Sequence, residues 1–195
     1  MSVIEIENAI PKLYQDQVEA ETTSTKMMWS FHVESARSVA AFQNSFGGFS
    51  QIAYHIKDQN PTFSPLTAML LPMLFMFCEK ANVPFNALLR IRLGLFPRTM
   101  LDIPHRNPHV DFYQPHQTAL YYVNDSDGDT VIFNETFDDL NLEQAAKHAD
   151  ANKFTVKQRL SPKKGRMALV DGKYYHASMH PQISASRIVI TFNFV

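Results

Sequence analysis

Hydrophobic and polar positions follow a helical pattern upstream of about residue 83. Residues 11–21 have a helical composition, and Ser64-Pro65 is typical of an N-cap followed by proline at the first helical position. The segment from there to about Ala81 is almost wholly apolar, which predicts a helix buried against a sheet. Pro72 either kinks this helix or marks its true start. Shorter elements are also expected: an edge strand at 3–6, a strand or gate loop at 27–33 and a helix at 35–42.

Downstream of residue 83 the pattern changes to the period of two that is typical of strands. One strand is predicted in "FNALLRIRLGLF", ending near Gly94, and "NDSDGDT", "SPKKG" and "DG" are typical turns. The acidic, Ala-rich residues 138–152 predict an excursion with some helix. The further predicted strands are 107–113, 118–124, 130–133, 154–160, 166–170, 173–177 and 186–195. Helices followed by about eight short strands indicate a sandwich or barrel with helices on one face.

Length and composition favour a single globular domain over residues 1–195. The chain is 45% hydrophobic, and its formal net charge of -1 with no block of like charge gives no signal for nucleic acid or an anionic membrane. We expect residues 1–83 to be a mostly helical support region and 84–195 the β-barrel core. Cys78 is the single cysteine, so neither an intrachain disulfide nor a Cys-based zinc site is possible. No basic signal region or membrane-length apolar run is present, so a cytoplasmic protein is expected.

The last predicted strand carries a polar row opposite an apolar one. Ile188, Ile190, Phe192 and Phe194 alternate with the polar row, which begins at Arg187 and includes Thr191 and Asn193. The apolar row is expected to face the helices. The polar row would then face a barrel cavity, where Thr191 and Asn193 are candidates for the pocket lining. An inward arginine needs an anion, either from the protein or from a ligand.

His109 and Asp111 are two residues apart and therefore share one face of the predicted strand. His176 follows in "KYYHAS", 65 residues after Asp111, and Arg187 lies 11 residues further on. Two imidazoles and one carboxylate can hold one face of a metal ion and leave the opposite positions open, as in non-haem Fe(II) oxygenases. Binding a cation would also explain why a carboxylate points inward.

Together these residues resemble the 2-oxoglutarate- and Fe(II)-dependent dioxygenases, in particular the prolyl 4-hydroxylase-like superfamily. "PHVDF" is similar to the family's proximal ligand motif, and "TALYYVNDSDGDTVIF" to its next strand, turn and strand. "SPKKGRMALVDGKYYHASMH", followed by "SASRIVITFNF", is similar to its closing pattern of glycine, histidine and arginine. The resemblance covers roughly residues 84–195.

The resemblance implies a double-stranded β-helix, a jelly-roll or cupin-like barrel with supporting helices. It implies that His109, Asp111 and His176 hold Fe(II), that 2-oxoglutarate is the cosubstrate and that O2 is the oxidant. Arg187 would pair with the distal carboxylate of 2-oxoglutarate, assisted by Tyr122 or, as second candidate, Tyr121. The expected activity is hydroxylation of a peptidyl, prolyl-like substrate or of a small molecule.

Three alternatives are open at this point. The first concerns single residues: His109 with Asp111 also fits a surface ion pair or a satisfied hydrogen bond, and Arg187 a structural salt bridge to a core carboxylate. The whole chain also fits a non-catalytic jelly-roll binding module, with or without a metal, because fold does not decide function. A cupin-type metal enzyme without a 2-oxo acid is the third. The roles of His105, His116 and His180 and the oligomeric state, a homodimer included, are left open by the sequence.

Overall fold

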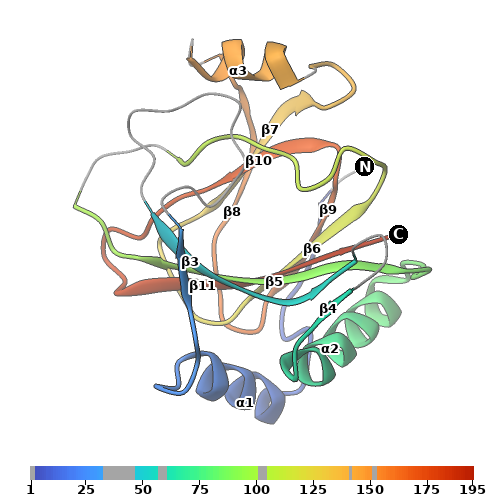
Figure 1. The fold of residues 1–195 in the computed structure, drawn as a ribbon, viewed down its shortest axis with the longest axis vertical. Coiled ribbons are helices and arrows are strands. Elements are labelled where there is room, and N and C mark those ends of the chain that lie inside the picture. Colours follow the sequence, from blue (N-terminus) through green and yellow to red (C-terminus); the bar gives the residue numbers. More distant parts are fainter. Residues whose placement is uncertain (1–2, 33–46, 57–60, 101–104, 141, 151–152) are drawn as a thin grey trace.

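The computed structural model describes residues 3–32, 47–56, 61–100, 105–140, 142–150 and 153–195 of the chain. These residues form a layered β structure with helices on both outer sides (Figure 1). The helix expected at 35–42 lies outside the described residues. No helix within the described ranges is long and apolar enough to cross a membrane.

Two antiparallel sheets form the centre of the fold. The strands of the larger sheet are, in spatial order, β1 (Ile4–Ile6), β9 (Met167–Asp171), β6 (Gln117–Tyr122), β11 (Ser186–Phe194), β5 (Leu88–Pro97), β3 (Gly48–His55) and β2 (Ser30–His32), with β4 (Thr62–Phe63) paired to β3. The strands of the smaller sheet are β10 (Tyr174–Ser178), β7 (Thr130–Thr136) and β8 (Val156–Leu160). From β6 onward the chain passes repeatedly between the two sheets, and this winding produces a double-stranded β-helix.

Helices α1 (Lys12–Thr22) and α2 (Leu66–Ala81) cover the outer face of the larger sheet (Figure 1). The hydroxyl of Ser64 accepts a hydrogen bond from the Leu66 amide at 3.2 Å, and the helix ends at Asn82, whose φ of 52° is left-handed. Pro72 lies inside α2 and does not begin it. The predicted apolar row of β11 packs here, against Leu70, Met73, Leu74 and Phe77 of α2.

A second apolar cluster fills part of the space between the sheets, and a third covers the outer face of the smaller sheet. Tyr122 and Val189 of the larger sheet contact Ile132 and Leu160 of the smaller one. On the outside, Ala145 of α3 (Leu142–Asp150) packs in a cluster with residues of β7 and β10. The helix predicted within 138–152 is therefore present and covers that face.

The short strand β4 was not predicted, and β7 runs on to Thr136 beyond the predicted 130–133. Three further differences between the strand predictions and the structure are larger. β5 runs on to Pro97 and does not end near Gly94. β3 was not predicted, because a register shift between Ile52 and Tyr54 interrupts the alternation that would have revealed it. Residues 107–113 form only one isolated bridge and no strand. Pro108 has no N–H to donate, which disfavours a continuous ladder there.

Candidate metal centre and its pocket

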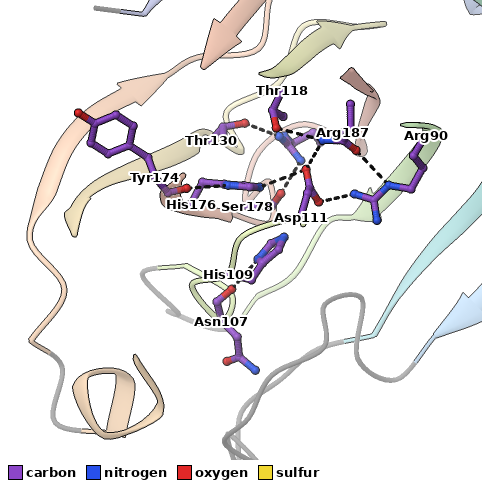
Figure 2. A network of polar contacts seen from close by, with 11 residues as sticks. Arg90, Asn107, His109, Asp111, Thr118, Thr130, Tyr174, His176, Ser178 and Arg187 are labelled. Carbon is purple, nitrogen blue, oxygen red and sulfur yellow. Dashed lines mark hydrogen bonds and ion pairs between the residues drawn. The ribbon is translucent and has the colours of Figure 1, made fainter. Parts of the chain in front are cut away.

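His109, Asp111 and His176 meet although residues 107–113 are not a strand. The His109 amide donates to the His176 carbonyl at 3.0 Å, and the His176 amide donates back to the His109 carbonyl at 2.9 Å. This two-bond bridge joins the segment to β10 and places the two imidazole rings 4.5 Å apart between centroids. One ligand atom from each of the three residues lies within 4.8 Å of the others, so the group could hold a metal ion (Figure 2).

Both histidines present the same ring nitrogen to the centre of the group. Nδ1 of His109 lies 3.0 Å from the Asn107 carbonyl, and Nδ1 of His176 lies 3.3 Å from the Tyr174 carbonyl (Figure 2). A carbonyl can only accept, so each Nδ1 carries a proton, and in the neutral form of each ring the lone pair is on Nε2. Backbone carbonyls fix metal-binding histidines in this way in many proteins. Both rings are therefore in the tautomer that a metal requires.

Asp111 is held by side chains from two neighbouring strands of the larger sheet, and a side chain from a third strand contacts one of them. Arg90 of β5 forms an ion pair with Oδ1, and Asn193 of β11 donates from Nδ2 to Oδ2 at 2.9 Å. The same amide nitrogen donates to Thr118 of β6 at 3.0 Å, while Arg90 Nε donates to the amide oxygen of Asn193 at 3.1 Å. Arg90, Asn193 and Thr118 lie opposite one another in the sheet register. A cross-strand row of polar groups thus fixes the carboxylate (Figure 2).

The electrostatic state of the three residues suits a cation. Burial, together with the nearby His176, lowers the pKa of His109 to about 3, so its ring is neutral near pH 7. Burial alone would raise the pKa of Asp111, but the Arg90 guanidinium beside it holds that pKa well below its ordinary value. The site therefore offers a carboxylate and a neutral imidazole without deprotonation. The alternative of a surface ion pair is wrong, because only 6% of the Asp111 side chain is exposed.

Arg187 is one of the largest fully buried side chains in the described residues and lines the same pocket. Its Nη1 donates to the Ser178 hydroxyl at 3.1 Å and its Nη2 to the Thr130 hydroxyl at 2.6 Å. Within the described ranges Arg187 forms no ion pair, and its Nε has no hydrogen-bond partner. The alternative of a structural salt bridge to a core carboxylate therefore has no support among these residues. The arrangement can receive an anion.

The other predicted residues take different places. Tyr122 lies beside Arg187, with ring and guanidinium 5.8 Å apart, and its hydroxyl donates to the Thr130 hydroxyl at 2.9 Å. Tyr121 points the other way, into the core against the helices. Thr191 lines the pocket. Asn193 is fully buried and is not among the lining residues, because its amide is used to hold Asp111.

The pocket spans about 540 Å³, its open mouth included, and contains residues that the sequence analysis did not assign. Arg92 of β5 and Arg106 line it together with Arg187, and Arg90 lies just behind Asp111. Arg90 and Arg92 alternate with Leu89, Ile91 and Leu93 in "LLRIRL". The rule that singled out Arg187 on the last strand, a cation in the polar row of an apolar strand, would have identified both.

The remaining histidines fall outside the group of three. Nδ1 of His105 contacts the Arg106 carbonyl at 2.7 Å, and the His105 ring packs on Phe133. His116 is buried beneath Phe112, and His180 Nε2 lies 3.1 Å from Arg106 Nη1. His180 is thus near the mouth, as a neighbour of a lining residue.

No protein-family model matches the sequence, and no curated protein matches it either. Solved structures, by contrast, match over nearly the whole chain. An oxidoreductase of the 2OG-Fe(II) oxygenase family from Burkholderia pseudomallei aligns with a TM-score of 0.67 at 9% identity, over 98% of this chain and 84% of the other.

Two further structures are similar. A prolyl hydroxylase from Trichoplax adhaerens, in complex with a peptide fragment of the hypoxia inducible factor oxygen degradation domain, aligns with a TM-score of 0.55 at 16% identity, over 98% and 82% of the two chains. HygX from Streptomyces hygroscopicus, with nickel and 2-oxoglutarate bound, aligns with a TM-score of 0.57 at 13% identity, again over 98% and 82%. This chain therefore has the double-stranded β-helix fold of the 2-oxoglutarate- and Fe(II)-dependent oxygenases.

Proposed function

We propose that the protein is an Fe(II)- and 2-oxoglutarate-dependent oxygenase of the hydroxylase type. The observation that carries the proposal is one pocket lined by both a His-Asp-His group and a buried arginine without a carboxylate partner in the described residues. A metal-free binding module would need neither of these features, and a metal-binding module would not need the buried arginine. The shared fold with proteins described as 2OG-Fe(II) oxygenases supports the same conclusion.

His109, Asp111 and His176 are the proposed metal ligands. Two imidazoles and one carboxylate suit a divalent ion of borderline hardness, and a set of three ligands leaves positions open for other molecules. The Nδ1 contacts to carbonyls and the cross-strand row behind Asp111 hold the ligand atoms in place. The residues present therefore fit Fe(II).

Arg187 is proposed to bind the distal carboxylate of 2-oxoglutarate. Its planar guanidinium can meet a carboxylate in two hydrogen bonds, and burial strengthens such a pair. Thr130 and Ser178 orient the guanidinium, while Tyr122 acts through Thr130, whose hydroxyl accepts from both Tyr122 and Arg187. Tyr122 is thus proposed as a positioning residue for the cosubstrate, and Tyr121 is no longer a candidate, because its side chain packs against the helices.

When bound, the iron and 2-oxoglutarate would supply the oxidising power, with O2 as the oxidant and succinate and CO2 as products. The chain's own part is to orient the two groups and to exclude water. Phe96, Leu120 and Val189 provide the apolar share of the pocket lining, which limits water around the metal. The substrate class proposed at this level is a peptide or a small molecule. We further propose that the chain acts as one domain, with all of these residues supplied by 84–195.

The first test is to add Fe(II) and 2-oxoglutarate to the metal-stripped protein without oxygen and to look for the weak visible metal-to-ligand charge-transfer band. The band is expected, because 2-oxoglutarate would chelate iron through its keto and carboxylate oxygens. With an intact fold, absence of the band and of 2-oxoglutarate binding by calorimetry would favour the non-catalytic binding module. Metal binding without 2-oxoglutarate binding would favour the cupin-type enzyme.

Two variants separate the roles within the site. His176→Ala should abolish iron binding and 2-oxoglutarate turnover. Arg187→Ala should raise the 2-oxoglutarate concentration that is required while metal affinity is retained. Arg159→Gln, an exposed arginine on β8, is the matched control and should change neither quantity. Undiminished turnover in His176→Ala would refute the metal assignment, and loss of iron binding in Arg187→Ala would refute the role of that arginine.

A further inference from the structure

Arg106 is one of two arginines in the pocket lining, with Arg92, that the proposed reaction does not use. Its backbone amide donates to the Ser178 carbonyl at 2.8 Å, which fixes it beside the residue whose hydroxyl accepts from Arg187. Its guanidinium lies over the Phe96 ring at 5.3 Å from the centroid. Arg106 therefore shares a wall with the cosubstrate arginine and also lines the pocket of the metal group.

The contacts that hold the Arg106 side chain are to neutral groups. Nη1 lies 3.1 Å from Nε2 of His180 and 3.4 Å from the Gly47 carbonyl. His180 Nδ1 lies 2.9 Å from the Pro97 carbonyl, so its proton is on Nδ1 and its Nε2 accepts from Arg106. Among the described residues, no carboxylate forms an ion pair with Arg106. These contacts therefore orient the Arg106 side chain, but no carboxylate among the described residues neutralises its charge through an ion pair.

Like charges increase the cost of this arrangement. Burial, together with the neighbouring positive charges of Arg92 and Arg187, lowers the pKa of Arg106 to about 10. Holding guanidinium groups together in a partly desolvated pocket is costly unless an anion joins them. The proposed cosubstrate would engage Arg187, so Arg106 is available for a different anion.

We propose that Arg106 determines substrate specificity by binding a carboxylate of the substrate beside the metal. This inference rests on the proposed function and narrows it to carboxylate-bearing substrates. The planar fork of a guanidinium matches a carboxylate, and a site built for such a pair discriminates strongly against a neutral analogue. The carboxylate could belong to a free acid or to a Glu side chain in a peptide, and the test separates these sources.

The experiment uses protein loaded with Zn(II) and 2-oxoglutarate, in which no turnover occurs. Binding is measured by calorimetry and ligand-observed NMR for two pairs of probes that differ in one charge. The first pair is propionate and propionamide; the second is N-acetyl-Gly-Glu-Gly-amide and its Gln counterpart. Wild-type protein should prefer the charged member of a pair by at least about tenfold. Arg106→Gln should remove that preference, and Arg159→Gln should keep it.

Each outcome decides the proposal. A preference for propionate assigns a free acid, and a preference confined to the Glu peptide assigns an acidic side chain. Equal binding of charged and neutral probes, or an unchanged preference in Arg106→Gln, would overturn the inference. The inference would also be overturned if Arg106→Gln weakened the binding of 2-oxoglutarate as much as Arg187→Ala does, because Arg106 would then bind the cosubstrate. Circular dichroism checks the fold of each variant.

Failure of the proposed function gives a different result. In that case the charge-transfer band with Fe(II) would be absent, while the charge preference at Arg106 would still be measurable in protein without metal. A band that forms normally together with no charge preference rejects only the role of Arg106.

Discussion

Asn193→Leu should weaken metal binding although Asn193 is not a ligand. The substitution keeps the side-chain volume and removes the amide that donates to Oδ2 of Asp111 at 2.9 Å. Oδ2 is also the carboxylate oxygen that lies 3.9 Å from Nε2 of His176, so the amide positions the oxygen next to the other ligand. Without it, the Arg90 ion pair, which engages Oδ1, still holds the carboxylate.

The size of the effect follows from this geometry. A hydrogen bond to a charged group contributes about 1.5–3 kcal/mol, and loss of a partner behind a metal ligand typically weakens metal binding by about 10- to 100-fold. Because Arg90 continues to hold one carboxylate oxygen, we expect the lower end, about tenfold. Thr118→Val is the matched control: it removes a hydroxyl that Asn193 contacts and leaves the Asn193–Asp111 bond in place, so its effect should be below about threefold.

The assay is a competitive metal titration followed by calorimetry, without substrate or oxygen. Circular dichroism and urea unfolding establish that each variant is folded before it is titrated. Metal affinity in Asn193→Leu within about twofold of the wild type would show that the cross-strand row does not position Asp111. A loss in Thr118→Val as large as in Asn193→Leu would show that the row acts through general packing.

Three further predictions concern stability. Asp127 accepts backbone hydrogen bonds from residues 182–184 at 2.8–2.9 Å, and these bonds hold its pKa below the ordinary value, so Asp127→Ala should lower the free energy of unfolding by about 1–2 kcal/mol at pH 7. Since a lowered pKa stabilises the fold above the unfolded value of about 3.9 and less as pH falls below it, urea unfolding at pH 3 should show a smaller difference, and an equal one would contradict this cause. Gly165→Ala should lower the free energy of unfolding by more than about 1 kcal/mol, because φ at this position is 80° and the added Cβ would meet the Gln15 amide. That amide cannot move freely, since it donates a hydrogen bond to a backbone carbonyl. Thermal unfolding that shows no change in stability would refute this constraint. Leu74→Ala, in the fully buried face of α2, should lower the free energy of unfolding by about 2–5 kcal/mol. A loss of less than about 1 kcal/mol in denaturant unfolding would mean that the helix packs loosely.

The sequence was most informative about features that follow from a single local pattern, such as strand alternation or helix capping. The two faces of β11 were predicted from alternation, and the structure places the apolar row against α2 and Arg187 in the pocket. The start of α2 could likewise be predicted from Ser64 and Pro65, because the helix begins at Leu66. These features depend on local geometry, which the order of residues determines directly.

Contacts between distant segments could not be predicted from local patterns. The meeting of His109 and His176 was expected from the family resemblance alone, and the bridge that joins these segments, 67 residues apart, was not predicted. The network behind Asp111 requires the register of β5, β11 and β6, which is set by the whole sheet. The sequence shows Arg90 as a cation among apolar residues, but it does not indicate that Arg90 pairs with Asp111.

The origin of the three candidate ligands gives the centre a mechanical consequence. His176 belongs to the smaller sheet, whereas the carboxylate of Asp111 is bound by side chains from β5 and β11 of the larger one. A metal ion bound by His176 and Asp111 would therefore cross-link the two sheets. Loading with metal should then slow hydrogen exchange in β10 and β11 together, because separating the sheets would require release of the ion. Metal binding and the association of the two sheets at this site would therefore depend on each other.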